Sequence, residues 1–170
     1  MPNLELIMLA RVVHVMAGVT WAGATSLMAA AIVPIAVRYG TEGAGRWTAA
    51  IARRVGPMAG ISALLTVLSG SYLYVSLHSN DRSASGIVLG VGALAAILSL
   101  LVGFFIGRPA RVKLSDLSER HSLAATPTAD VLEGISRARL RALVSARLAA
   151  ALLGVAVLSM ASFRYAQAIF

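Results

Sequence analysis

The chain has 170 residues, of which 58% are hydrophobic and only 13% are charged, and its formal net charge at pH 7 is +8. Soluble globular proteins carry about 25% charged residues, so this composition excludes an ordinary water-soluble domain and indicates a chain surrounded mostly by lipid. Cysteine is absent, which excludes disulfide bonds and thiolate metal sites and leaves histidine, methionine and carboxylate as ligands.

Four apolar blocks follow one another along the chain. The first block begins at Val12 and exceeds the roughly 20 residues that a helix needs to cross a bilayer. A signal peptide is the alternative interpretation, but Glu5 stands where a signal peptide has basic residues, so we expect the helix to be retained. The sequence therefore predicts one all-α membrane domain, a bundle of four transmembrane helices at about 12–37, 55–77, 86–107 and 148–168.

Basic residues are concentrated in the first and third connections between the blocks, which lie on the same side of the membrane. The first connection holds Arg38, Arg46, Arg53 and Arg54, and the third holds Arg108, Arg111, Lys113, Arg120, Arg137, Arg139, Arg141 and Arg147. By the positive-inside rule this side is cytoplasmic, so both termini are expected to be periplasmic in a bacterial inner membrane. We interpret the net charge as a topology signal and expect no nucleic-acid partner, because no basic face with stacking aromatics is visible.

The stretch of about 108–146 is the only sizeable polar region, and it is predicted to be a cytoplasmic loop. Within it, Thr126-Pro127 resembles a helix start. A partly amphipathic pattern follows at Val131, Leu132, Ile135 and Leu140. We therefore expect the fourth helix to extend into the cytoplasm.

Pairs of glycines spaced by four residues mark candidate helix-packing faces, since helices in lipid associate through small residues. These pairs are Gly56/Gly60, Gly86/Gly90 and Gly103/Gly107. We expect them to pack within the bundle. The hydroxyl stripe at Ser62, Thr66, Ser69 and Ser76 is likewise interpreted as polar packing.

All seven acidic residues lie outside the four apolar blocks. Ion-coupled transporters and proton pumps usually place a carboxylate inside the membrane, so their absence from the blocks argues against that class.

His14 is the ionisable residue that lies inside an apolar block, where it is costly without a partner or a ligand. Residues at helical spacing from it share its face, namely Arg11, Gly18, Trp21, Thr25 and Met28. Two interpretations stay open. The imidazole binds a cofactor or metal, or it is bonded to a backbone carbonyl or a hydroxyl of a neighbouring helix.

His78 ends the second block and is expected within about one helical turn of the depth of His14. Met16 and Met160, with Met8, fall near the same level, and histidine with methionine suits copper, especially Cu(I). Alternatively, His14 and His78 bind the iron of a haem in the bundle core. The structural alternative is that His78 lies at the membrane interface and the methionines fill the core.

The first block contains His14, six further residues, Trp21-Ala22-Gly23 and an apolar run to Pro34. This pattern resembles the first helix of CopD-type bacterial membrane proteins. Similar endings in that group match Met160-Ala161 and Arg164-Tyr165. The resemblance implies copper handling across the inner membrane with His14 as the matched position.

The spacing from His14 to Trp21 is also similar to that of HemJ-type protoporphyrinogen oxidases, which bind haem b. This resemblance implies that His14 is a haem ligand. It does not extend to the lysine that the HemJ-type family uses in a later helix, because the only lysine here, Lys113, falls in the predicted loop of about 108–146.

Three functions follow as expectations. The first is a CopD-like protein that binds copper or haem near its outer face. The second is a non-catalytic accessory subunit of a respiratory or photosynthetic membrane complex. The third is a haem-dependent redox enzyme.

Overall fold

The computed structural model describes residues 3–39, 44–78, 81, 83–123 and 128–166, and within these ranges all regular secondary structure is helical. Four continuous helical stretches follow one another. They are α1 (Leu4–Leu27) with η1 (Met28–Ile32) and α2 (Val33–Tyr39); α3 (Ala44–His78); α4 (Ala84–Leu101) with η2 (Val102–Gly107) and α5 (Arg108–Leu123); and α6 (Ala129–Ser162) with η3 (Phe163–Tyr165).

Each of the four stretches contains a segment long and apolar enough to cross a membrane. These segments are Leu4–Tyr39, Ala50–His78, Ala84–Arg120 and Ala129–Tyr165. The predicted all-α bundle with four transmembrane helices is therefore confirmed, and the chain is a multi-pass membrane protein. The segments hold 29 to 37 residues, which is more than the roughly 20 that a crossing needs. The last two predicted positions of the fourth span, 167 and 168, lie outside the described residues.

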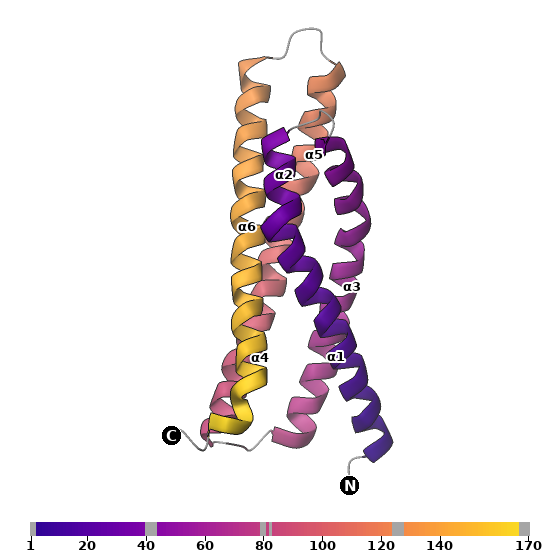
Figure 1. Cartoon of the computed structure of the whole chain (residues 1–170), viewed down its shortest axis with the longest axis vertical. Helices are drawn as coiled ribbons and strands as arrows, with labels where there is room; N and C mark the ends of the chain where they lie inside the picture. The colour runs from indigo at the N-terminus through magenta and orange to yellow at the C-terminus, as the bar shows by residue number, and fades with distance from the viewer. Residues whose placement is uncertain (1–2, 40–43, 79–80, 82, 124–127, 167–170) are drawn as a thin grey trace.

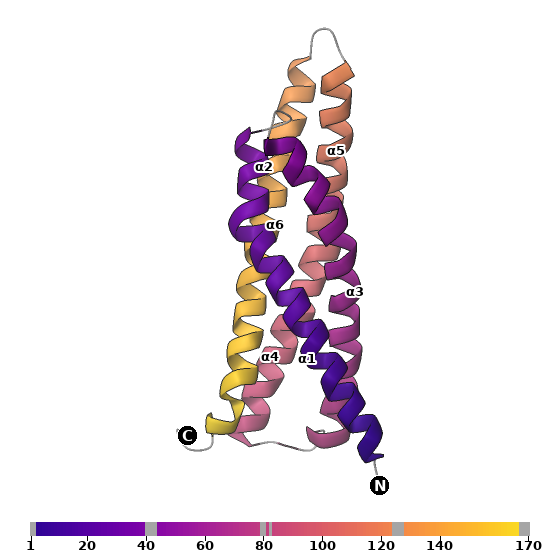
Figure 2. The same cartoon turned by 45° about the vertical axis from the view of Figure 1, so that its right-hand side comes forward.

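The bundle consists of two antiparallel helix pairs (Figures 1 and 2). In one pair α1 lies against α3, and in the other α4 and α5 lie along α6, whereas α3 and α4 touch much less. The start of α1 and the end of α6 lie at the same end of the bundle, which we call the terminal end (Figure 1). The tips of α5 and α6 form the opposite end, called the hairpin end.

Trp21 is the large side chain at the centre of the bundle. It is buried together with Ala63 of α3, Ala96 of α4 and Ala156 of α6. Alanine on three neighbouring helices leaves room for one indole ring, so the ring fills the space where the two helix pairs meet. Its role is core packing.

Each of the two π-helical turns, η1 and η2, ends two residues before a proline. The N–H of Val33 bonds to the carbonyl of Met28 just before Pro34, and the N–H of Arg108 bonds to the carbonyl of Gly103 just before Pro109. A proline has no N–H and clashes with the carbonyl four residues earlier. The wider turn relieves that conflict while the helix continues, as local π geometry commonly does in membrane helices.

The stretch 108–146, predicted to be a loop, is instead mostly helical. It forms α5 and the first half of α6, which lie side by side and extend beyond α2 and α3 at the hairpin end (Figure 1). The contact between them is close: a Cβ added at Gly134 would lie 3.0 Å from a methyl carbon of Leu117. The predicted extension of the fourth helix is correct, but its partner helix α5 was missed.

Small residues at heptad spacing hold α6 against its partner. Seven of the eight buried positions of α6 form one row, namely Ile135, Ala138, Ala142, Ser145, Ala149, Leu153 and Ala156; the eighth is Ala146. The seven recur every 3.5 residues on average, which is the period of an antiparallel coiled coil. Ser99 of α4 faces this row and donates a hydrogen bond from Oγ to the carbonyl oxygen of Ala149 at 2.9 Å. The alanines let the two backbones approach closely.

Most of the paired glycines do not form the predicted packing faces. Among the described residues, a Cβ added at Gly56, Gly60, Gly90 or Gly103 would meet nothing within 4 Å. The close approach of α4 to α6 occurs instead at Gly92, where a Cβ would lie 2.8 Å from the Cβ of Ser159. The face with Gly56 and Gly60 therefore points away from its own bundle.

Candidate functional site

The imidazole of His14 lies in the interface between α1 and α3, where it is partly buried. Its Nδ1 donates a hydrogen bond to the backbone carbonyl oxygen of Thr66 at 2.9 Å. Of the two interpretations of His14, the structure contains the contact with a backbone carbonyl. The hydrogen bond joins two membrane-spanning helices through a buried polar group.

Two glycines shape this interface around the imidazole. A Cβ added at Gly70 would lie 2.7 Å from Cε1 and 2.9 Å from Nδ1 of His14. Distances this short do not occur between real Cβ atoms and their neighbours, so the ring position requires a glycine here. On the other helix, Gly18 lies opposite the methyl group of Thr66, 3.6 Å from where its own Cβ would be.

The hydroxyl groups of α3 bond to carbonyls of their own helix. Thr66 Oγ1 donates to the carbonyl oxygen of Ser62 at 2.7 Å, and Ser69 Oγ donates to that of Leu65 at 2.6 Å. Ser69 also approaches the carbonyl oxygen of Thr66 at 3.3 Å. The hydrogen-bonding capacity of these hydroxyls is therefore satisfied by carbonyls of α3, in line with the packing role expected for this stripe.

The hydrogen bond of His14 defines its tautomer. A carbonyl oxygen only accepts, so Nδ1 must carry the proton, and a neutral ring then has its lone pair on Nε2. In the part of the chain that the structure describes, no hydrogen-bond partner accompanies Nε2. Histidines that bind metals are commonly held through the other ring nitrogen in this way.

His78 occupies a different environment at the terminal end of α3. Its ring stacks on Tyr74 with centroids 6.4 Å apart and meets the ring of Phe163 edge-on at 6.2 Å. Phe163 follows α6 directly, so His78 helps to join the second helix pair to the first. These contacts are those of an aromatic packing residue.

The prediction that the two histidines lie within about one helical turn of the same depth is wrong. The ring of His14 lies against Gly70, and His78 follows Gly70 by eight residues on the same helix. At 1.5 Å per residue this places His78 about 12 Å further along the helix axis. A shared metal ion requires both nitrogens within about 2.1 Å of it, which this arrangement does not allow.

The methionines do not complete a ligand set around His14. Met16 is 66% exposed and Met8 is 62% exposed, so both side chains point out of the bundle. Met160 is partly buried on α6, one turn before the Phe163 that contacts His78. Among the described residues, no group of three or more histidine, aspartate or glutamate side chains gathers to hold a metal. The donors proposed for copper therefore do not converge.

Asp81 takes part in the N-terminal cap of α4 at the terminal end of the bundle. Its Oδ1 accepts a hydrogen bond from the N–H of Ser83 at 2.9 Å, and Ser83 Oγ in turn accepts one from the N–H of Gly86 at 3.3 Å. The hydrogen bonds from the hydroxyl and the N–H of Ser83 lower the pKa of Asp81, and the nearby His78 adds to this effect. This arrangement caps the helix.

Thr66 and Gly70 are the contact residues that the sequence analysis did not assign to His14. The sequence feature that could have identified them is a glycine one turn after a threonine in the middle of an apolar helix. In lipid, that combination indicates close approach of another helix. It did not indicate which residue would approach.

Comparison of the chain with protein-family models, with curated proteins and with solved structures gives no match. The resemblance to CopD-type and HemJ-type proteins therefore stays a sequence-based expectation.

Proposed function

We propose that this chain is a non-catalytic accessory subunit of a larger complex in a bacterial inner membrane. The observation that carries the proposal is the open face of α3 at Gly56 and Gly60, where a Cβ added to either glycine would meet no atom of another described helix within 4 Å. In lipid, faces of this kind are where helices associate, because they let two backbones come close. A transmembrane helix of another subunit would fill this face.

The use of the polar groups inside the bundle supports the same proposal. His14, Thr66 and Ser99 all donate to helix carbonyls. Such bonds stabilise helix packing in lipid, where an unpaired polar group costs several kcal/mol. His14 and Ser99 therefore join neighbouring helices of this chain, whereas the hydroxyl of Thr66 is satisfied within α3.

The orientation in this proposal follows from charge. Basic residues are concentrated at the hairpin end, and the terminal end has few of them. The positive-inside rule then places the hairpin in the cytoplasm and both termini in the periplasm. The tip of the hairpin is in this case available to subunits at the cytoplasmic surface.

Binding of haem through His14 is the second candidate function. The observation that favours it is the hydrogen bond from Nδ1 to the carbonyl oxygen of Thr66, because a ring held in this way would have the Nε2 lone pair to bind iron. His78 is too far along α3 to be the opposite ligand. A copper site made of His14, His78, Met16 and Met160 is not retained, since these residues do not converge.

The test is mild purification in detergent from the native membrane. We expect stoichiometric co-elution of other membrane proteins with the wild-type chain. Gly60→Leu should release them, because a leucine side chain blocks the α3 face. Gly154→Leu on α6 is the matched control, because Gly154 is equally open but has no second glycine four residues away, and it should retain the partners.

Absorption spectroscopy on the same preparation separates the two candidates. A chain that elutes alone with a Soret band, lost in His14→Ala, would replace the accessory-subunit proposal with haem binding. A chain that elutes alone and colourless would refute both.

A further inference from the structure

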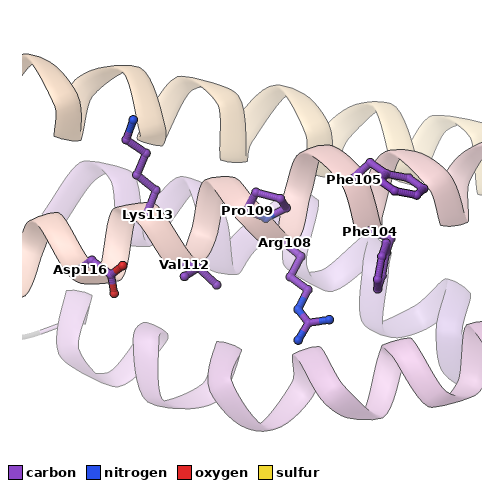
Figure 3. A pocket seen from close by; sticks show the side chains of 7 residues that line it. All are labelled: Phe104, Phe105, Arg108, Pro109, Val112, Lys113 and Asp116. Atoms are coloured by element: carbon purple, nitrogen blue, oxygen red, sulfur yellow. The ribbon is translucent and has the colours of Figure 1, made fainter.

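A shallow groove runs along the outer face of η2 and α5, close to where the third helical stretch leaves its apolar segment (Figure 3). Two ridges of side chains at four-residue spacing border it. One ridge consists of Phe104, Arg108, Val112 and Asp116, and the other of Phe105, Pro109 and Lys113. Each ridge therefore begins with an aromatic ring and continues to a cation.

The side chains of the groove are available to a ligand in the membrane. Phe104 is 52% exposed and Phe105 is 67% exposed, and their rings meet edge to face with centroids 5.2 Å apart. The guanidinium of Arg108 lies over the ring of Phe104 at 5.6 Å. This cation–π contact holds the charge at the apolar end of the groove.

The groove lies at the boundary between hydrocarbon and headgroups. The segment from Ala84 to Gly107 contains no charged residue, and Arg108 directly follows it. At 1.5 Å per residue that uncharged segment is about 36 Å long, which matches the roughly 30 Å hydrocarbon core with some tilt. Phe104 and Phe105 are thus at the depth of acyl chains, and Arg108 and Lys113 are at the depth of phosphates.

Charge along the hairpin changes sign with distance from the membrane. In the membrane-proximal parts, 104–113 of the third stretch and 137–147 of α6, every charged residue is basic. Further out, acidic residues at Asp116, Glu119, Asp130 and Glu133 outnumber the single Arg120. The positive band is complementary to an anionic bilayer surface, and the groove lies within it.

We propose that this groove binds an anionic phospholipid. The phosphate lies beside the Arg108 guanidinium, while an acyl chain lies over Phe104 and Phe105. The Lys113 ammonium points to the other side of α5 (Figure 3) and contributes through its charge near the bilayer surface. Guanidinium and ammonium groups are the usual partners of phosphate. Asp116 closes the outer rim and weakens the site by repelling the headgroup.

The experiment is native mass spectrometry of the full chain in detergent, titrated with phosphatidylglycerol or with phosphatidylcholine. The wild type should bind one phosphatidylglycerol more tightly than phosphatidylcholine. Each basic residue near an anionic surface is worth about fivefold in affinity. Arg108→Gln should thus weaken phosphatidylglycerol about fivefold, and Arg108→Gln with Lys113→Gln about 25-fold.

Arg120→Gln, which removes the same charge further from the membrane, is the matched control and should leave binding unchanged. Asp116→Asn should tighten binding about fivefold, which tests the groove even if the arginine variants do not fold. Inorganic phosphate at millimolar concentration should not displace the lipid. Equal losses in Arg108→Gln and Arg120→Gln, no preference over phosphatidylcholine, or displacement by inorganic phosphate would each overturn the proposal. The measurement needs no partner subunit, so its outcome is independent of the accessory-subunit proposal.

Discussion

Replacing Gly70 with alanine tests the His14 interface most directly. The new Cβ would lie 2.7 Å from Cε1 and 2.9 Å from Nδ1 of His14. Because the imidazole is the end of a side chain, it can move aside, but it then leaves the carbonyl oxygen of Thr66. The substitution therefore breaks the hydrogen bond between α1 and α3 without touching His14 itself.

The expected cost combines two effects of opposite sign. Overpacking a close contact destabilises a protein by about 1–3 kcal/mol. The loss of the interhelical hydrogen bond accounts for about 0.6–1.7 kcal/mol of that total. Alanine in place of glycine in a helix stabilises by up to about 1 kcal/mol. Gly60→Ala isolates this second effect, because no atom lies within 4 Å of its added Cβ. We expect Gly70→Ala to be less stable than Gly60→Ala by about 1–3 kcal/mol.

The assay is equilibrium unfolding in mixed detergent micelles, followed by circular dichroism. A double-mutant cycle with His14→Ala supplies the decisive comparison. Once the imidazole is gone, Gly70→Ala should behave like Gly60→Ala, since the clash has been removed. If Gly70→Ala and Gly60→Ala are equally stable in the wild-type background, the contact between His14 and Gly70 is refuted.

Two further predictions concern α4. Gly92→Ala should destabilise the bundle by about 1–3 kcal/mol in the same assay, since its Cβ would lie 2.8 Å from the Cβ of Ser159; Gly90→Ala, with open space, should not, and equal effects would contradict the packing of α4 on α6. The pKa of Asp81 is lowered in the folded state by Ser83, so the stability that this carboxylate contributes is present above about pH 4 and is lost as the pH falls through its folded pKa. Asp81→Asn should flatten the pH dependence of unfolding in that acidic range, and an unchanged profile would argue against the hydrogen bonds from Ser83.

The number of membrane spans was predictable from the sequence because it depends on length and polarity alone. A bilayer requires about 20 apolar residues per helix, and unbroken blocks of that kind are visible without knowledge of packing. The ends of the helices were not predictable in this way. Helices continue past the hydrocarbon core wherever another helix covers them, and α5 and α6 cover each other.

The polar stretch was misjudged because its packing depends on small size and not on hydrophobicity. Of the apolar residues in the predicted pattern, Ile135 is buried at 6% exposure, but Leu132 and Leu140 are 50% and 62% exposed. The buried face continues through Ala138 and Ala142, at 3% and 2% exposure. Alanines contrast little with their neighbours on a hydropathy scale, so a seam built from them is difficult to see in a sequence.

The depth of the two histidines was misjudged for a geometric reason. Counting residues from the membrane boundary assumes that all helices stand parallel and begin at one level. Here α1 crosses the bundle obliquely and begins beyond the end of α6 at the terminal end (Figures 1 and 2). The relative shift of two helices depends on which side chains interlock, and for α1 and α3 that is the fit of His14 onto Gly70.

Pro109 explains how the third helical stretch both packs against α6 and carries the groove on its outer face. Ser99 and Gly107 both face α6, yet they are eight residues apart. In a straight α-helix eight residues turn about 80° past two full turns, so Gly107 would rotate out of the seam. The π turn of η2 absorbs the extra residue and returns Gly107 to α6, where a Cβ added to it would lie 3.3 Å from Oγ of Ser145. The same shift in helical phase turns the groove of η2 and α5 toward lipid. Pro109, which prevents regular hydrogen bonding, thereby also determines which face of the hairpin would meet the headgroups.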